Sequence, residues 1–354
     1  MSIQEYLEIV VKKEASDLHI VAGSPAMTRI DGLLVPVSVG LLTPEETEAL
    51  IFELLSPEQK DMLLVNKELD FSFALGDVAR FRVNAYFEKG YLAAALRLIT
   101  SYIKTIEELN LPKIIHDFTR LRQGLVLVTG PTGHGKSTAI ASMINEINQT
   151  KPLHIVTIED PIEYVYPRGK SLVSQREMHL DTHSWDVALR SALREDPDVV
   201  LVGEMRDYET IASAITVAET GHLVFATLHT NSAAQSIDRI IDVFPENQQS
   251  QIRMQLASVI AGVVSMRLVP GIGGGRLPAC EILLSSPAVS TAIREGKEHQ
   301  IDNIIQTSGD VGMILLDASL AYLVREGRIS LDIAKTYSIR PEELDRLVRQ
   351  STGV

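Results

Sequence analysis

The stretch Gly130-Pro131-Thr132-Gly133-His134-Gly135-Lys136-Ser137 has the pattern G-x-x-x-x-G-K-S. It follows the apolar run 124–129, and residues 138–147 are predicted to be helical. A glycine-rich turn between a strand and a helix presents backbone N–H groups and the positive end of the helix dipole to phosphate oxygens. The alternative is a glycine-rich turn that carries a lysine by chance. The flanking strand and helix favour a phosphate-binding loop.

The residue types in this loop indicate a nucleoside triphosphate with its metal ion. Lys136 can reach the β- and γ-phosphates, and the Ser137 hydroxyl can ligate Mg²⁺. We therefore expect ATP and Mg²⁺ as cofactors. The predicted nucleotide-binding residues are Gly130, Thr132, Gly133, His134, Gly135, Lys136, Ser137 and Thr138.

Composition excludes several other classes of protein. The formal net charge of −13 argues against a general nucleic-acid binder, because phosphate contacts need clustered Lys and Arg. The single cysteine, Cys280, excludes an internal disulfide and a multi-cysteine zinc site. No apolar run approaches the ~20 residues of a membrane helix, and residues 1–6 lack the features of a signal peptide. These features suit a cytoplasmic protein.

The pattern along the chain predicts an α/β fold with a small α+β domain before it and a helical region after it. We expect an amino-terminal α+β domain with its linker in residues 1–110, an ATPase core in 111–268, and a helical region in 269–354. Thr43, Pro44 and Glu46 form a helix-initiating capping box, and Asp31-Gly32 is a hairpin signal. The predicted first-domain strands are 17–20, 27–30, 33–37, 71–75, 79–87 and 91–99, and the predicted short helices are 6–11 and 106–112.

Four apolar runs predict the strands of the core, at 125–128, 155–158, 199–202 and 223–228. They lack polar alternation, as expected for parallel strands that are buried on both faces. A helical stripe is predicted to close the core through Ile252, Leu256, Val259, Ile260 and Val263. After the glycine-rich turn at 271–275, the chain is predicted to be mostly helical.

Polar clusters follow three of these strands, at 159–163, 203–207 and 229–231. The carboxyl ends of parallel strands meet at one edge of the sheet, so we expect the clusters to lie beside the phosphate loop. Glu204 would hold Mg²⁺ through water or help order the site, Glu163 would orient or deprotonate the attacking water, and His229 would contact the γ-phosphate. The structural alternatives are a metal-free loop carboxylate, a surface ion pair and a strand-end histidine.

These segments together resemble the type IV pilus retraction ATPases, the PilT-like branch of the secretion ATPase superfamily. The resemblance covers nearly the whole chain. The segments that carry it are 80–84 (Arg-Phe-Arg-Val-Asn), 130–137, 157–163 (Thr-Ile-Glu-Asp-Pro-Ile-Glu), 173–177, 188–194, 203–207 (Gly-Glu-Met-Arg-Asp) and 221–231.

The resemblance implies a homohexameric ring that converts ATP hydrolysis into mechanical work. Each subunit would have a PAS-like amino-terminal domain and a RecA-like core. Glu163 would be the catalytic glutamate, Glu204 the Walker B carboxylate and His229 the γ-phosphate sensor. Arg82 and Arg97 would stabilise transition-state charge, and their structural alternative is a strand-face salt bridge. Expected partners are an inner-membrane platform protein at the pilus base and an accessory pilus ATPase, with no nucleic acid.

The chain departs from the family at two places. The family usually has serine where His134 stands, and it carries A-I-R-N-L-I-R-E where residues 288–295 read Ala-Val-Ser-Thr-Ala-Ile-Arg-Glu. We expect nucleotide binding to survive the first change, because that position contributes mainly its backbone N–H. The second change leaves the ATPase chemistry intact and bears on the retraction role.

Other functions compete with pilus retraction. Pilus extension and type II secretion ATPases usually have a longer amino-terminal region and a four-cysteine zinc element. A chain whose only cysteine is Cys280 cannot form that zinc element. An accessory retraction ATPase is the nearest alternative. A nucleic-acid translocase on the same core is disfavoured by the net acidity. A regulatory subunit with little turnover is disfavoured by Glu163 and Glu204.

Overall fold

The computed structural model describes residues 1–13, 15–30, 33–76, 78–99 and 102–349, and the chain forms two compact units. The first unit is Met1–Tyr102 with Pro161–Val165, and the second is Ile103–Asp160 with Tyr166–Val354. Among the described residues, no helix is both long and apolar enough to cross a membrane. The predicted hairpin signal Asp31-Gly32 lies outside the described residues.

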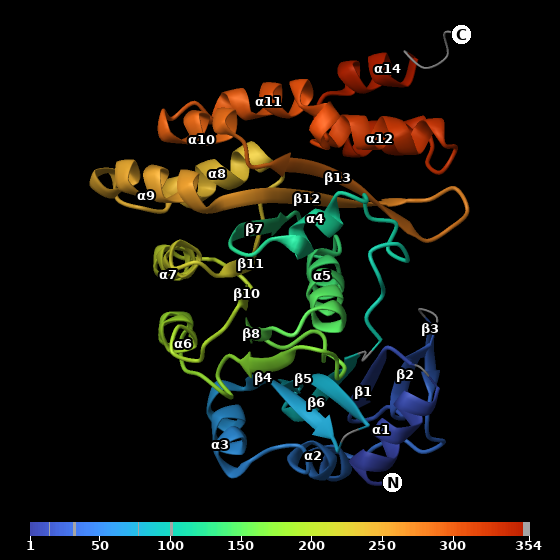
Figure 1. The fold of residues 1–354 in the computed structure, drawn as a ribbon. Coiled ribbons are helices and arrows are strands. Elements are labelled where there is room, and N and C mark those ends of the chain that lie inside the picture. The colour runs from blue at the N-terminus through green and yellow to red at the C-terminus, as the bar shows by residue number, and fades with distance from the viewer. Residues whose placement is uncertain (14, 31–32, 77, 100–101, 350–354) are drawn as a thin grey trace. The chain divides into compact units, whose positions relative to one another are not determined.

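The first unit is a six-stranded antiparallel sheet with three helices (Figure 1). Its helices are α1 (Ile3–Lys12), α2 (Pro44–Phe52) and α3 (Pro57–Asn66). The strand order is β3-β2-β1-β6-β5-β4, and the strands are β1 (Asp17–Val21), β2 (Met27–Ile30), β3 (Leu33–Pro36), β4 (Glu68–Leu75), β5 (Ala79–Glu88) and β6 (Tyr91–Ile99). The predicted capping box of Thr43 and Glu46 is confirmed. One core holds the helices against the sheet, so alternate strand residues such as Arg82 are exposed.

The second unit is built on a seven-stranded sheet in the order β13-β12-β7-β11-β10-β8-β9. All neighbouring strands are parallel except β12 and β13, and the four predicted core strands are confirmed. The strands are β7 (Gly124–Thr129), β8 (His154–Glu159), β9 (Leu172–Glu177), β10 (Val199–Val202), β11 (Leu223–Leu228), β12 (Ile260–Pro270) and β13 (Arg276–Leu284).

Helices cover both faces of this sheet, which makes β7, β10 and β11 buried along their whole length. Successive residues of β7 point to different cores: Leu125 and Leu127 pack with α6 to α9, whereas Val126 and Val128 pack with α4 and α5 (Figure 1). The helices are α4 (Ile115–Arg120), α5 (Lys136–Thr150), α6 (Trp185–Ala192), α7 (Tyr208–Glu219), α8 (Ala233–Asp242), α9 (Glu246–Val259), α10 (Pro287–Arg294), α11 (Ile301–Thr307), α12 (Leu316–Arg325), α13 (Leu331–Tyr337) and α14 (Pro341–Arg349).

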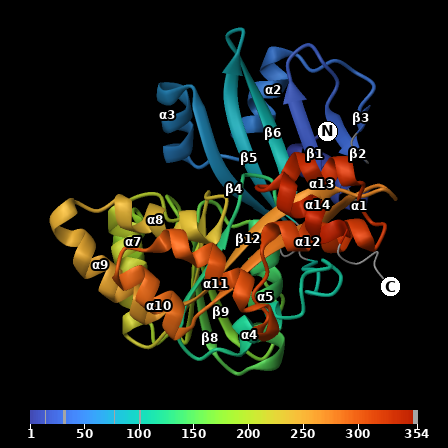
Figure 2. The same cartoon turned by 90° about the horizontal axis from the view of Figure 1, so that it is seen from above.

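Two sequence predictions were wrong in detail. The predicted helical stripe ends at Val259, and Ile260 begins β12, because the edge of β7 offers a partner strand for the β-branched residues that follow. The hairpin β12–β13 then extends the sheet, and α10, α11 and α12 lie over it (Figures 1 and 2). The predicted helix 106–112 is a single turn, because Asn110 has a positive φ of 56° and Pro112 follows.

A buried carboxylate on β13 joins two helices of the second unit. Glu281 accepts hydrogen bonds from the Ala233 N–H (2.7 Å) and the Leu316 N–H (3.5 Å), the first residues of α8 and α12. Burial raises the pKa of Glu281 from its ordinary 4.5 to about 7, with a further increase from the Asp302 carboxylate. The folded chain therefore keeps a proton between these two pKa values that the unfolded chain loses.

This retained proton predicts a pH-dependent effect of Glu281→Gln. The wild-type contribution of this group to stability should fall as the pH rises from 5 through 7, whereas glutamine cannot ionise. The free energy of unfolding of the variant, relative to the wild type, should therefore rise by about 2 kcal/mol between pH 5 and pH 8. Urea unfolding at both pH values measures this difference, and a constant difference would contradict the buried-carboxylate account.

Candidate nucleotide site

The phosphate loop leaves the carboxyl end of β7 and enters α5 in a conformation that needs glycine. Gly130, Gly133 and Gly135 have φ angles of 138°, 78° and 87°. A Cβ on Gly130 would lie 2.4 Å from the Met266 carbonyl oxygen of β12, which leaves no room for any side chain. The loop therefore turns tightly, and the first turn of α5 carries Ser137 and Thr138.

The Lys136 side chain is buried over this loop, with the residue only 8% exposed. Its ammonium donates to the Gly130 carbonyl (2.8 Å) and the Pro131 carbonyl (3.2 Å), and it lies 3.4 Å from His229 Nδ1. These contacts hold the charge of Lys136 at the mouth of the loop, where the phosphates of a nucleotide would lie.

His229 links the phosphate loop to Glu204. The strands β7, β11 and β10 are neighbours about 4.8 Å apart, and Gly130, His229 and Gly203 directly follow their ends. An ammonium only donates hydrogen bonds, so His229 Nδ1 is the acceptor and the ring proton lies on Nε2. That nitrogen is 2.9 Å from Glu204 Oε1. Thr132 Oγ1 also lies 3.4 Å from Nδ1.

Glu204 is set up to remain ionised. Burial raises the pKa of its carboxyl group, but a hydrogen bond from Arg206 and the adjacent His229 outweigh burial and hold the pKa below its usual value. Arg206 Nη2 lies 2.8 Å from Glu204 Oε2. The site thus combines a buried cation with an anionic carboxylate, joined by an imidazole. His222, at the opposite end of β11, instead contacts the Val217 carbonyl and Thr220.

The other predicted site residues belong to the first unit. Glu163 is exposed in the loop after β8, within the stretch Pro161–Val165 that groups with that unit. Arg82 and Arg97 are directly opposite each other on β5 and β6. Arg97 Nε is 2.9 Å from Asp17 Oδ1, so the strand-face salt bridge exists, yet the Arg97 side chain remains 71% exposed. The functional roles of these residues stay predictions.

Sequence reasoning missed three polar contacts in this region. It gave no role to Arg206, although this residue stands in the motif 203–207. It assigned His134 only a backbone contribution, whereas His134 Nδ1 accepts a hydrogen bond from the Leu268 N–H (2.9 Å). It also missed Arg276, which donates to the Gly133 carbonyl (3.1 Å). The last two contacts depend on the unpredicted hairpin, so no local signal could have revealed them.

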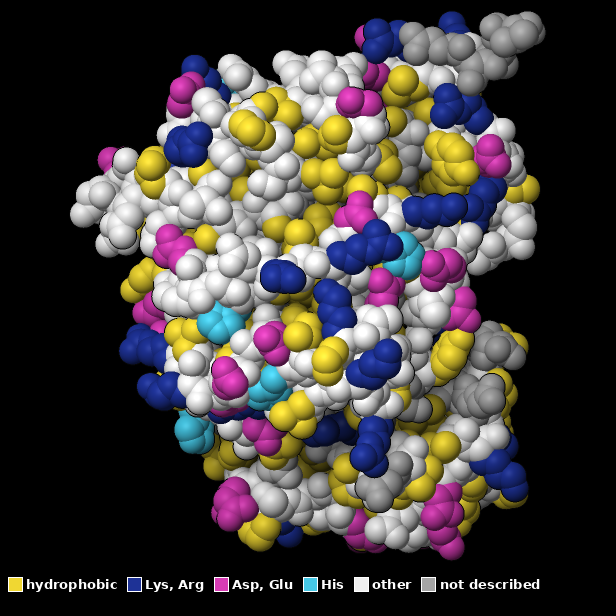
Figure 3. Space-filling model, in the orientation of Figure 1, with side chains coloured by type: hydrophobic (Ala, Val, Ile, Leu, Met, Phe, Trp, Pro, Cys, Tyr) yellow, Lys and Arg dark blue, Asp and Glu magenta, His cyan; other side chains and the backbone are white. Residues whose placement is uncertain are grey.

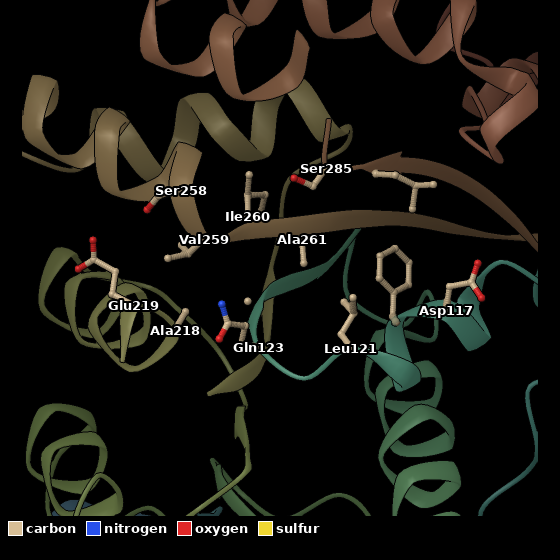
Figure 4. Close-up of a pocket in the computed structure, with 13 residues that line it drawn as sticks. Asp117, Leu121, Gln123, Ala218, Glu219, Ser258, Val259, Ile260, Ala261 and Ser285 are labelled. Carbon is tan, nitrogen blue, oxygen red and sulfur yellow. The ribbon is translucent and has the colours of Figure 1, made fainter. Parts of the chain in front are cut away.

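A separate pocket of about 590 Å³ lies at the opposite end of the central strands. Gly124, the first residue of β7, and Ile260, the first residue of β12, line it. Figure 4 shows Asp117 of α4 and Glu219 of α7 on opposite sides of this pocket, with Gln123 between them. Because the phosphate loop follows the other end of β7, this pocket is not part of the candidate nucleotide site.

A glycine-rich loop, a buried lysine and a nearby carboxylate at the carboxyl edge of a parallel sheet are the groups with which an ATPase can hold a phosphate chain. The chain belongs to the type II/IV secretion system protein family, whose model matches residues 1–299. It is 48% identical to the "Type IV pilus retractation ATPase PilT" of Pseudomonas aeruginosa over 342 residues, which cover 97% of this chain and 99% of the relative.

Two further comparisons cover nearly the full length. The type IV pilus ATPase PilU of Pseudomonas aeruginosa is 37% identical over 350 residues, covering 99% of this chain and 92% of the relative. A crystal structure of the pilus retraction motor PilT with bound ADP matches with a TM-score of 0.91 and 46% identity, covering 98% of this chain and 99% of that one.

Proposed function

We propose that this ATPase is a homohexameric motor that drives type IV pilus retraction from the cytoplasmic side of the inner membrane, at the pilus base. The observation that carries the proposal is the match to a retraction ATPase at 48% identity over nearly all of both chains. In this motor, residues 1–110 would form the amino-terminal domain, 111–268 the ATPase core and 269–354 the helical region. Lys136, His229 and Glu204 would form the nucleotide-responsive part of the core.

The phosphate chain of ATP would bind the N–H groups of the loop and the amino end of α5. The Lys136 ammonium would exchange the Gly130 and Pro131 carbonyls for β- and γ-phosphate oxygens. Because Lys136 also contacts His229, this movement would change the hydrogen bond that His229 shares with Glu204. His229 would in this way report whether a γ-phosphate is present. Glu163 would orient or deprotonate the attacking water.

The residues present suit Mg²⁺ bound together with the nucleotide. Among the described residues, no group of three or more His, Cys, Asp or Glu is arranged to hold a metal ion by itself. Mg²⁺ usually takes only one or two protein ligands, and substrate phosphates and water complete its shell. Ser137 and Glu204 offer the hard oxygen atoms that this ion prefers. Mg²⁺ held there would neutralise phosphate charge.

Alanine at Arg82 or Arg97 should slow hydrolysis more than it weakens ATP binding, because the charge that they would stabilise develops in the transition state. The turnover number and the nucleotide dissociation constant, measured separately, check this expectation. Asp17→Asn is the matched control, since it removes the ion-pair partner of Arg97 and leaves both arginines in place. If Asp17→Asn reproduces the defect of Arg97→Ala, Arg97 acts through the salt bridge instead.

We further propose that the motor acts on an inner-membrane platform protein and works with an accessory pilus ATPase. For this chain we favour the role of the retraction motor over that of the accessory ATPase, because its sequence identity to PilT is 48% and its identity to PilU is 37%. A nucleic-acid translocase is disfavoured by the net charge of −13. Figure 3 shows Asp and Glu side chains beside Lys and Arg on this face.

A deletion strain tests the direction of the motor. If the chain drives retraction, the strain should carry abundant surface pili and lose twitching motility. The intact gene should restore motility, and the Lys136→Ala gene should not. Electron microscopy of surface pili and a twitching-zone assay provide the two measurements. A strain without pili that regains them from this gene would show that the protein extends pili.

A further inference from the structure

The phosphate loop packs against the part of β12 that extends beyond the end of its neighbour β7. β12 pairs with β7 only as far as Ser265 and Thr129, whereas it pairs with β13 up to Pro270. Beyond Thr129 the chain turns away at Gly130, so the last residues of β12 have one edge that β7 does not cover. The long hairpin that results is visible in Figure 1.

Two residues of the loop, Gly130 and His134, lie against this edge of β12. Gly130 packs against the Met266 carbonyl, and His134 Nδ1 accepts the Leu268 N–H at 2.9 Å. The imidazole therefore supplies the acceptor that a neighbouring strand would otherwise provide to β12. The residue before His134, Gly133, also contacts the hairpin. Its carbonyl accepts a hydrogen bond from Nη1 of Arg276, which is the first residue of β13 (3.1 Å).

His134 also contacts the carboxyl-terminal helices. Its ring lies 6.4 Å from the ring of Tyr337, the last residue of α13, in a tilted arrangement with an interplanar angle of 58°. α13 belongs to the group of helices whose apolar core includes Val269 and Ala279 of the hairpin. One side chain of the phosphate loop thus touches β12 by a hydrogen bond and α13 by ring packing.

The environment keeps this imidazole neutral. Nδ1 accepts a hydrogen bond, so the ring proton lies on Nε2. Burial lowers the pKa of His134, and the cations of Arg267 on β12, Arg276 on β13 and Lys136 on α5 lower it further. A second ring proton would occupy Nδ1 and would eliminate the acceptor for the Leu268 N–H.

We propose that His134 is a positioning residue that fastens the phosphate loop to the hairpin β12–β13, so that nucleotide affinity depends on the hydrogen bond from the Leu268 N–H to the imidazole. The proposal rests on the proposed ATPase function. It gives the His134 side chain a role of its own, distinct from the backbone contribution of that loop position. Serine, the usual residue of the family there, reaches one bond less far from the backbone and would leave the Leu268 N–H unpaired.

Two substitutions separate the hydrogen-bond acceptor from the ring. In His134→Asn, the amide Oδ1 occupies the place of Nδ1, accepts a hydrogen bond and cannot titrate. In His134→Ser, the acceptor is too short. Near pH 8 the Asn variant should bind ADP within about threefold of the wild type, and the Ser variant should bind up to about tenfold more weakly, because a partly buried N–H is left without its acceptor. Titration of each protein with fluorescent ADP measures both constants.

The pH dependence provides a second readout that a purely structural role would not move. Because burial and the neighbouring cations lower the pKa of His134 below its ordinary 6.5, the affinity of the wild type should approach that of His134→Ser only as the pH falls well below 6.5. The ratio of wild-type to His134→Asn affinity should fall with it, because only the imidazole gains a proton. Dividing by the Asn variant removes the titration of ADP and of other groups. Thermal melts without nucleotide verify that the variants fold.

Each contrary result has a distinct meaning. Equal losses in the Asn and Ser variants would overturn the proposal, because they would assign the effect to ring packing against Tyr337. Wild-type affinity in His134→Ser at every pH would also overturn it. If the wild type itself bound no ADP and hydrolysed no ATP, the proposed function would fail, and that result is distinguishable from failure of the His134 proposal alone.

Discussion

Lys136→Ala should abolish ATP turnover. The ammonium is the buried cation of the loop, and it contacts two loop carbonyls and His229. Without it, the charge that develops on the β- and γ-phosphates loses the one cation that the loop itself places beside them in a partly dry site. Phosphate release measures turnover, and titration with fluorescent ADP reports binding.

Lys151→Ala is a suitable control, because Lys151 stands at the other end of α5 and donates to the Thr119 carbonyl (2.6 Å). This variant should keep its turnover. Near-normal hydrolysis by Lys136→Ala would refute the assignment of the phosphate loop.

The second large effect is expected at Glu163. If its carboxylate handles the attacking water, Glu163→Gln should retain ATP binding and lose hydrolysis by ~10²-fold or more. Glutamine keeps the size of the side chain and eliminates its basicity, so binding and chemistry separate in this variant. Single-turnover kinetics with radiolabelled ATP measure the chemical step directly.

Glu159→Gln provides the comparison within the same acidic segment. Glu159 is buried and accepts hydrogen bonds from Thr157 (2.7 Å) and Gln175 (3.3 Å), so its substitution should lower thermal stability more than turnover. A Glu163→Gln protein that binds no nucleotide, or that hydrolyses ATP at the wild-type rate, would exclude the proposed role.

Local chemistry made much of this fold predictable. The glycines of the phosphate loop adopt backbone angles that few other residues adopt. The side chains of Thr43 and Glu46 accept hydrogen bonds from backbone N–H groups at the start of α2. The same signal, Ser56-Pro57-Glu58-Gln59, starts α3, which we did not predict. His229 and Glu204 could be placed at one edge because parallel strands share their polarity.

The remaining features depend on contacts between distant segments. Ile260 continues the apolar spacing of α9, and only the unfilled edge of β7 makes it a strand residue. The contacts of His134 and Arg276 with the loop and hairpin follow from that pairing, so no nearby residue encodes them. Arg97 illustrates the limit for charged groups, since one exposed side chain can serve both an ion pair with Asp17 and the predicted role in hydrolysis.

The single cysteine has a practical consequence for measuring motion. Cys280 is fully buried on β13, and burial raises the pKa of its thiol to about 12, so almost none of it is the reactive thiolate at neutral pH. The unmodified chain should therefore react very slowly with maleimide dyes. A cysteine at exposed Val65 of the first unit and another at exposed Tyr322 of the second would take up a dye pair without competition from Cys280. Energy transfer between the two dyes would then follow the separation of the units through each cycle of nucleotide binding and release.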